Sequence, residues 1–175
     1  TSEEISIIEQ NIKNAGKFGC NGLVLGMHDH EFKLDIKILK KWKSMAGPMH
    51  LTFHRAFDVL KNPQEALEQL IQVGFDCILT SGQSEKAIDG ISKLIEWNKR
   101  FGSKINIMPG SGIGIDNCKI FKELGFSSIH LSAGKELSNI KIPNGVNKKL
   151  SFLNQSLKNT NVKILSEVVQ AFKSN

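Results

Sequence analysis

Five short runs of apolar and β-branched residues recur along the chain at nearly constant spacing. Each run begins about 25 to 28 residues after the previous one, the length of one strand-plus-helix unit in a parallel sheet. The spacing therefore predicts a chain of alternating strands and helices. The runs are GLVLG from residue 22, MHLTFH from 49, CILTS from 77, KINIM from 104 and SIHLS from 128.

Amphipathic segments with recognisable helix ends lie between these runs. The clearest begins with Asn62 as N-cap, Pro63 at the first helical position and Glu65 in the first turn, and apolar residues then follow at helical spacing. Glycines that follow the apolar stripes predict where helices stop. The predicted helices span residues 63–73, 84–101 and 116–124.

Apolar and polar residues alternate within the predicted strands. Strands of a doubly wound sheet are covered by helices on both faces and read as continuous apolar runs, whereas barrel strands turn one face to a lumen. The alternation therefore favours an α/β fold of the TIM-barrel-like (β/α) type. The polar parity consists of Thr52, His54, Asn106, Met108, His130 and Ser132.

The number of strands falls short of a closed barrel, which needs eight. We interpret residues 1–175 as a single domain that contains the C-terminal five strands of such a barrel, with the first three βα units missing. Residues 135–175 are read as a tail with a terminal helix. Because five strands leave two open edges, and open edges invite pairing with other chains, we expect either a homo-oligomer that covers these edges or a product that is not stable.

Composition narrows the classes of function. The net charge of +6 is carried almost entirely by lysines and the chain has no tyrosine, which disfavours a nucleic-acid partner. No run approaches the roughly 18 to 20 apolar residues of a membrane span, so no membrane partner is expected. The three cysteines, Cys20, Cys77 and Cys118, are widely separated in sequence, which favours a reducing, intracellular compartment.

The carboxyl ends of barrel strands are where binding and catalytic residues gather. One of these ends carries His54, Arg55 and Asp58. Arginine can clamp a carboxylate or phosphate, and histidine can exchange protons near neutral pH. In the alternative interpretation Arg55 and Asp58 pair with each other and His54 only satisfies hydrogen bonds in the lumen.

A glycine-rich turn follows the fourth run. Residues 108–113, MPGSGI, precede a helix predicted from Asp116, and exposed backbone N–H groups in such turns suit an anion. Glycines also simply permit a tight turn, so this alternative stays open.

Soft side chains on inward strand positions raise the possibility of a metal site. Imidazole, thioether and thiolate groups are the ligands that Cu(I) selects. Isolated methionines and histidines at such positions more often only pack. The candidates are His54, Met108 and His130, with Cys77 as a further possibility and Met27, His28 and His30 close together in sequence.

Four strings, TFHRAFD, ILTSGQ, INIMPGSGI and IHLSA, occur in this order and closely resemble the CutC family, which is linked to copper homeostasis. The resemblance covers roughly residues 1 to 134. It implies a TIM-barrel-like protein that is cytoplasmic, and in some members nuclear, that forms homo-oligomers and in some members binds Cu(I). Matched by position, the pocket residues of the family would be His54, Arg55, Asp58, Thr80, Ser81, Gly82, Pro109, Gly110, Gly112, Asn117, His130 and Ser132.

The chain departs from the family pattern at two places. Ser111 stands where the family usually has the middle one of three glycines. The cysteines proposed to hold copper in the family belong to the missing strands and have no match among Cys20, Cys77 and Cys118.

Two hypotheses of different classes follow. In the first, the protein binds or handles Cu(I), as the resemblance implies. In the second, the strand ends form an enzyme pocket for a small anionic substrate, which Arg55 and the glycine turn hold while His54 or Asp58 moves a proton.

Overall fold

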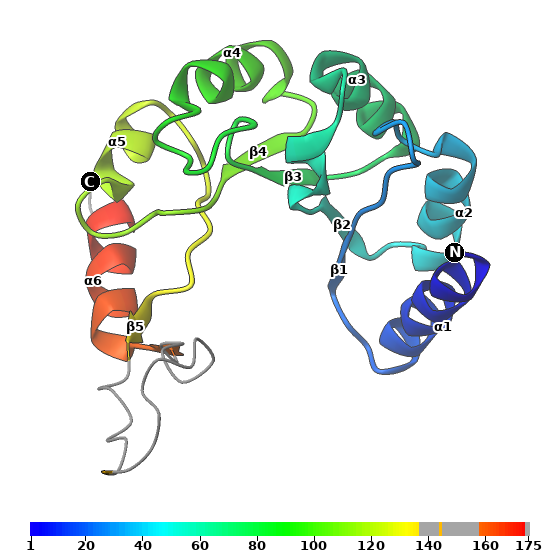
Figure 1. Ribbon diagram of the computed structural model, residues 1–175, viewed down its shortest axis with the longest axis horizontal. Coiled ribbons are helices and arrows are strands. Elements are labelled where there is room, and N and C mark those ends of the chain that lie inside the picture. The colour runs from blue at the N-terminus through cyan, green and yellow to red at the C-terminus, as the bar shows by residue number, and fades with distance from the viewer. Residues whose placement is uncertain (137–143, 145–157, 174–175) are drawn as a thin grey trace.

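The computed structural model describes residues 1–136, 144 and 158–173. A parallel sheet of four strands in the order β1-β2-β3-β4 forms the inner side of an arch, and the helices follow one another along its outer side (Figure 1). The fold is therefore the α/β repeat that the strand spacing predicts. The strands are β1 (Gly22–Leu25), β2 (His50–Phe53), β3 (Cys77–Thr80) and β4 (Asn106–Pro109).

Helices connect successive strands, as parallel pairing requires. A 3-10 helix, η1, comes directly after β2. The helices are α1 (Ser2–Lys17), α2 (Ile36–Ala46), η1 (Arg55–Val59), α3 (Pro63–Val73), α4 (Ile91–Phe101), α5 (Cys118–Glu123) and α6 (Val162–Lys173).

Some of the predicted helix ends are confirmed and others are wrong. Helix α3 begins at Pro63 and ends at Gly74, which adopts the left-handed conformation of a helix stop. Helix α4 begins at Ile91 instead of Ser84, because residues 84–90 form turns that fold back against the end of β3. Helix α5 begins at Cys118, with Asn117 and not Asp116 as its N-cap.

The hydrophobic core lies between the sheet and the helices. Leu51 and Phe53 of β2 and Ile78 of β3 are fully buried, and they pack in one cluster with the large side chains of the helices. Trp42 in α2 and Trp97 in α4 are the largest of these. The apolar parity of the strands thus faces the helices, as predicted.

The opposite, inner face of the sheet carries polar side chains. The strand register aligns Val24, Thr52, Cys77 and Asn106 across the four strands. The Asn106 amide donates to Cys77 Sγ at 3.6 Å and to Ser128 Oγ at 2.8 Å. Hydrogen bonds of Asn106 therefore link β3, β4 and Ser128 on the inner face, where a barrel would have its lumen.

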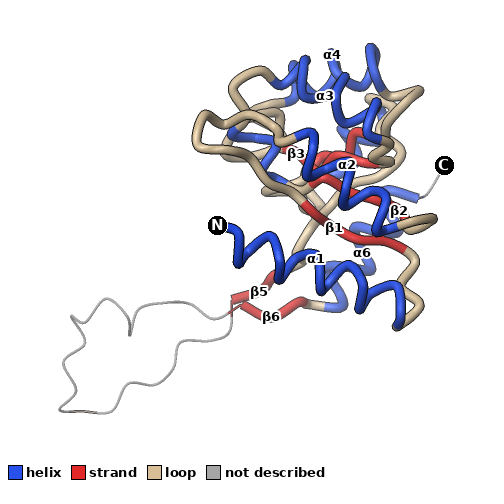
Figure 2. The backbone as a smooth tube through the Cα atoms, turned by 90° about the vertical axis from the view of Figure 1, so that its right-hand side faces the viewer, coloured by secondary structure: helices blue, strands red, loops and turns tan. Residues whose placement is uncertain are grey.

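The fifth predicted strand, residues 128–132, is reduced to a single parallel bridge between Gly110 and His130. The chain then turns into β5 (Gly134–Glu136), which pairs with β6 (Lys158–Thr160) in an antiparallel ladder apart from the main sheet (Figure 2). Helix α6 packs against α5. In the part of the chain described here, no helix has the length and apolar character needed to cross a membrane.

Candidate functional site

The turn after β2 contains residues that the sequence predicts to bind a ligand or to transfer a proton. His54 is the N-cap of η1, and its Nδ1 accepts the backbone N–H of Ala56 at 3.1 Å. The ring of Phe57, which is fully buried, meets Trp97 edge-to-face at a centroid distance of 5.4 Å. This aromatic contact fixes η1 against α4, so that Arg55 and Asp58 are presented at the end of β3.

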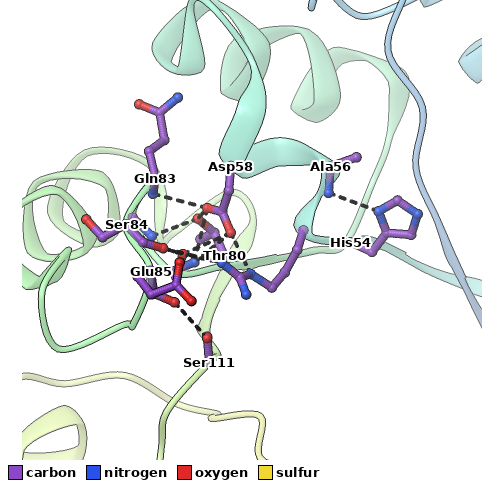
Figure 3. Close-up of polar contacts among 11 residues, drawn as sticks. His54, Ala56, Asp58, Thr80, Gln83, Ser84, Glu85 and Ser111 are labelled. Carbon is purple, nitrogen blue, oxygen red and sulfur yellow. Dashed lines mark hydrogen bonds and ion pairs between the residues drawn. The ribbon is translucent and has the colours of Figure 1, made fainter. Parts of the chain in front are cut away.

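Asp58 is the centre of the site (Figure 3). Its carboxylate accepts the Thr80 hydroxyl, the backbone N–H of Ser81 at 3.1 Å and the backbone N–H of Gln83 at 3.1 Å. Only 8% of the side chain is exposed. A buried carboxylate needs such donors to be stable, and here it ties η1 to the loop that follows β3.

Arg55 pairs with the same carboxylate. Its Nε lies 2.8 Å from Asp58 Oδ2, and its Nη2 donates to Ser81 Oγ at 2.8 Å and to the Ser84 carbonyl at 3.3 Å. The Ser81 hydroxyl lies within hydrogen-bonding distance of Asp58 and of the Ser84 carbonyl. The pairing of Arg55 with Asp58, one of the two interpretations of the sequence, is therefore present, and 42% of the Arg55 side chain stays exposed.

Two glycines allow the loop after β3 to close on itself. A Cβ on Gly90 would lie 2.0 Å from the Ser81 carbonyl, and one on Gly82 would lie 2.5 Å from the Gly90 carbonyl. Gly82 also has a φ of +72°. Backbone crosses backbone here, and only glycine fits at both positions.

His54 faces away from the carboxylate that its sequence neighbours share. Figure 3 shows its ring directed to the side opposite Asp58 and Thr80. The ring lies against Gly26 at the end of β1, where a Cβ would come within 2.4 Å of Nδ1 and of Cε1. His54, Arg55 and Asp58 thus belong to two separate environments.

The glycine turn after β4 is held by side chains. Asn117 Oδ1 accepts the Gly114 N–H at 3.0 Å, and its Nδ2 donates to the Gly112 carbonyl at 2.9 Å. Ser111, with a φ of 83°, donates its hydroxyl to the Glu85 carbonyl at 2.8 Å. A serine in this region of φ is unusual, because it is a region that glycine adopts most readily.

Backbone pairing places the ends of β3, β4 and the bridge beside one another. The Gly110 N–H donates to the Thr80 carbonyl at 3.0 Å, and the His130 N–H donates to the Pro109 carbonyl at 2.8 Å. Ser132 lies two residues after His130, and its carbonyl accepts the Thr160 hydroxyl at 3.3 Å.

Comparison with known proteins shows which family the chain belongs to. The model of the CutC family matches residues 1–135. The chain belongs to the CutC family. Within the family it is 33% and 32% identical, over 98% of its length, to proteins of two Bacteroides fragilis strains that are named family protein CutC, and the match covers 70% of each.

A crystal structure from the CutC family has the same fold. It is that of a candidate copper homeostasis protein CutC from Streptococcus agalactiae, with a TM-score of 0.70 and 28% identity. The match covers 74% of the present chain but only 64% of the S. agalactiae chain, so the present chain spans less than two thirds of that relative. The TIM-barrel-like fold class predicted from the sequence is confirmed.

The candidate copper ligands of this CutC chain do not surround one point. Phe53 of β2 pairs with Ile78 of β3, so the next residue, His54, lies beside Leu79. Leu79 in turn pairs with Met108 of β4, and it therefore separates His54 from Met108. His130 lies on the segment that follows β4 in the sheet, where it pairs with Gly110. Among the residues that the structure describes, no group of three or more His, Cys, Asp or Glu side chains could hold a metal ion.

Cys77 does not offer a ready thiolate. Burial raises the pKa of its thiol, and the hydrogen bonds from Thr52 and Asn106 only partly offset this. Thiolate is the form that binds metal and attacks electrophiles, so the Cys77 side chain behaves as a packed, neutral group.

The sequence interpretation placed Gly26 and Gln83 at strand ends without giving either a role, and it gave Gly90 no part in the site. Gln83 binds Asp58 through its backbone and the Leu60 carbonyl through its side chain at 2.7 Å. Gly26 and Gly90 provide space, which no periodic pattern encodes. A glycine directly after a strand, as in LVLG, marks a strand end at Gly26 but does not predict its contact with His54.

Proposed function

We propose that this protein acts in copper homeostasis and binds Cu(I) as its cargo. Membership in the CutC family over residues 1–135 carries this proposal, together with the description of the S. agalactiae relative as a candidate copper homeostasis protein. The soft side chains near the carboxyl ends of β2 and β4 support it, since Cu(I) prefers imidazole and thioether ligands.

The cell compartment and the assembly belong to the same proposal. Cys20 is exposed and Cys77 and Cys118 are buried, and all three are free thiols, which suits the reducing cytoplasm, with the nucleus as a second location as in some members of the family. A homo-oligomer would cover the outer edge of β1, which has no partner strand among the described residues.

Met108 and His130 are the ligands we favour, with His54 as a third candidate. Side chains two residues apart on a strand share a face, so Met108 and Gly110 point to the same side, and His130 pairs with Gly110. Leu79 stands between Met108 and His54. The described residues therefore offer a pair of soft groups and no closed three-ligand cage.

An anaerobic competition titration with a Cu(I) chelator tests the proposal. We expect binding near one equivalent, weakened about tenfold or more in Met108→Leu and in His130→Ala, because each change removes one soft ligand. His50→Ala is the matched control, since His50 is exposed at the opposite end of β2. Uptake no greater than that of a thermally denatured sample, or equal loss in the control, would exclude these ligands.

A second candidate function is the binding of a small anion at Arg55. The observation that favours it is a guanidinium that stays 42% exposed while Asp58, Ser81 and Ser84 fix its orientation. The contacts with Asp58, Ser81 and Ser84 use Nε and Nη2, so Nη1 is the nitrogen that would donate to a carboxylate or phosphate. On this view the strand ends would be the pocket of an enzyme for a small anionic substrate.

Titration with inorganic phosphate, followed by calorimetry, tests this second candidate. Arg55→Lys keeps the charge but loses the planar fork, so we expect weaker binding, whereas Arg100→Lys on the outer helices should change nothing. Identical titrations of wild type and Arg55→Lys would rule the anion site out.

A further inference from the structure

A short segment of the loop after β3 connects two strand ends that are far apart in the sequence. This segment, residues 84–87, is called the strap below. At one end the Ser84 carbonyl accepts Arg55 Nη2 at 3.3 Å, directly after β2. At the other end the Ala87 N–H donates to the Ser111 carbonyl at 3.0 Å, in the glycine turn after β4. The strap therefore touches the ends of both strands.

Ser111 holds the far end of the strap through two contacts. Its hydroxyl donates to the Glu85 carbonyl at 2.8 Å (Figure 3), and its own carbonyl accepts the Ala87 N–H. The Ala87 side chain is fully buried, so the strap is anchored where the second contact forms. The stem of Lys86 lies over the turn, since a Cβ on Gly112 would come within 3.0 Å of Lys86 Cγ.

The backbone of Ser111 is held against its own preference. Its φ of 83° lies in the left-handed region, which residues with a Cβ seldom adopt. Such a conformation persists only where surrounding contacts determine it, and it is common in ligand clamps and switch segments. A glycine would adopt this φ without support. The serine therefore makes the conformation of the turn depend on its contacts with the strap.

The near end of the strap shares the Arg55 guanidinium with η1. Arg55 Nε pairs with Asp58 at 2.8 Å, while Nη2 donates to Ser81 Oγ and to the Ser84 carbonyl. A shift of the strap therefore removes one of the acceptors that orient Nη2. Contiguous hydrogen bonds of this kind can carry energetic coupling between sites, and a measurement of the coupling decides whether they do.

We propose that Ser111 is a positioning residue for Arg55 and that the strap couples the two. When the Ser111 hydroxyl releases Glu85, the strap loosens and the guanidinium loses its fixed orientation. Because equilibrium coupling is reciprocal, loss of the Arg55 contact also loosens Ala87 at the far end. This coupling is a property of the protein without ligand, so it depends on neither the copper proposal nor the anion candidate.

The Arg55 side chain reports the coupling in one direction. The chain has two arginines, Arg55 and Arg100, so a ¹⁵N–¹H spectrum of the arginine Nε groups shows two signals, which Arg100→Lys assigns. Ser111→Ala keeps the Cβ and removes only the hydroxyl, so we expect the Arg55 signal to move toward that of free arginine while the Arg100 signal stays in place. Ser103→Ala, at an exposed turn position, is the matched control and should move neither signal. An unchanged Arg55 signal in folded Ser111→Ala would overturn the proposal.

Hydrogen exchange of the Ala87 amide reports the opposite direction. Ser111→Ala should speed this exchange about fivefold, because the strap loses one hydrogen bond. Arg55→Lys should speed it as well, although Arg55 reaches only Ser84 of the strap. The Asn106 amide, which donates to Asp76 at the opposite end of β4, is the reference, and the ratio of the two rates removes any change in global stability. A ratio that rises in Ser111→Ala but not in Arg55→Lys would show that Ser111 supports only its own turn, and would refute the coupling.

Discussion

Asp58 is the residue on which the geometry of the strand-end site depends. One carboxylate joins Arg55, Thr80, Ser81 and Gln83, which come from two separate segments of the chain. The sequence suggested Asp58 as a proton carrier or as the partner of Arg55. A carboxylate that accepts this many hydrogen bonds is instead suited to hold its neighbours in place.

Replacement of Asp58 by alanine should therefore destabilise the protein strongly. The change leaves buried donors on Thr80, Ser81 and Gln83 without a partner, so we expect a loss of about 3 kcal/mol in the free energy of unfolding. Asp89→Ala, at an exposed position, is the control and should stay within about 0.5 kcal/mol of wild type. Urea unfolding followed by circular dichroism measures both, and equal midpoints would contradict this role of Asp58.

Cys77 gives the protein a predictable weakness at alkaline pH. Burial raises the pKa of its thiol above the ordinary value of 9.0, so the unfolded chain loses this proton first as the pH rises. From about pH 9 upward the folded state then binds more protons than the unfolded state, and the free energy of unfolding should fall.

The pH dependence can be assigned to this thiol by mutation. Cys77→Ala should remove that part of the decline above pH 9, whereas Cys20→Ala, at an exposed position, should leave it unchanged. Unfolding in urea at pH 7, 9 and 10 measures the effect. A decline of the same size in Cys77→Ala would show that other groups cause it.

At the scale of elements, patterns that repeat were predictable and single contacts were not. The alternation of apolar and polar residues predicted the strands, and the apolar stripe at helical spacing predicted α3. Both patterns are readable because burial of apolar residues determines where strands and helices form. The start of α4 could not be predicted, because residues 82–90 fold into a loop that the Gly82–Gly90 backbone crossing permits. The orientation of His54 toward Gly26 likewise depends on β1, which is distant in sequence.

The backbone crossing after β3 can be tested with one added methyl group. Gly90→Ala places a Cβ 2.0 Å from the Ser81 carbonyl, so we expect the loop to move and stability to fall by about 1 to 3 kcal/mol. Gly114→Ala is the matched control, since nothing lies within 4 Å of its Cβ position. If both variants melt at the same temperature as wild type, the close approach of Ser81 and Gly90 is absent in solution.

At the scale of the whole molecule, the arch ends in an open strand edge. In the described sheet β1 is paired only with β2, and Val24 at its centre is 62% exposed. The sequence predicted such edges from the count of strands, but it placed a fifth strand where the structure has one bridge. That run could not hold a full ladder, since after His130 the chain leaves β4 to form β5.

The open edge predicts how association responds to mutation. If a second copy covers β1, Val24→Lys should place a charge in that contact and shift the protein toward the monomer, as lysines on natural edge strands do. Val59→Lys adds the same charge at another exposed valine and should not. Light scattering during size-exclusion chromatography measures the mass, and the same oligomer in Val24→Lys would show that β1 is not the interface.

The measurement that tests the copper proposal most directly is the copper K-edge X-ray absorption spectrum of the Cu(I)-loaded chain. The account predicts a first shell that contains both sulfur and nitrogen, from Met108 and His130, with the sulfur contribution lost in Met108→Leu. A shell of oxygen and nitrogen alone, or a sulfur contribution that persists in Met108→Leu, would contradict it.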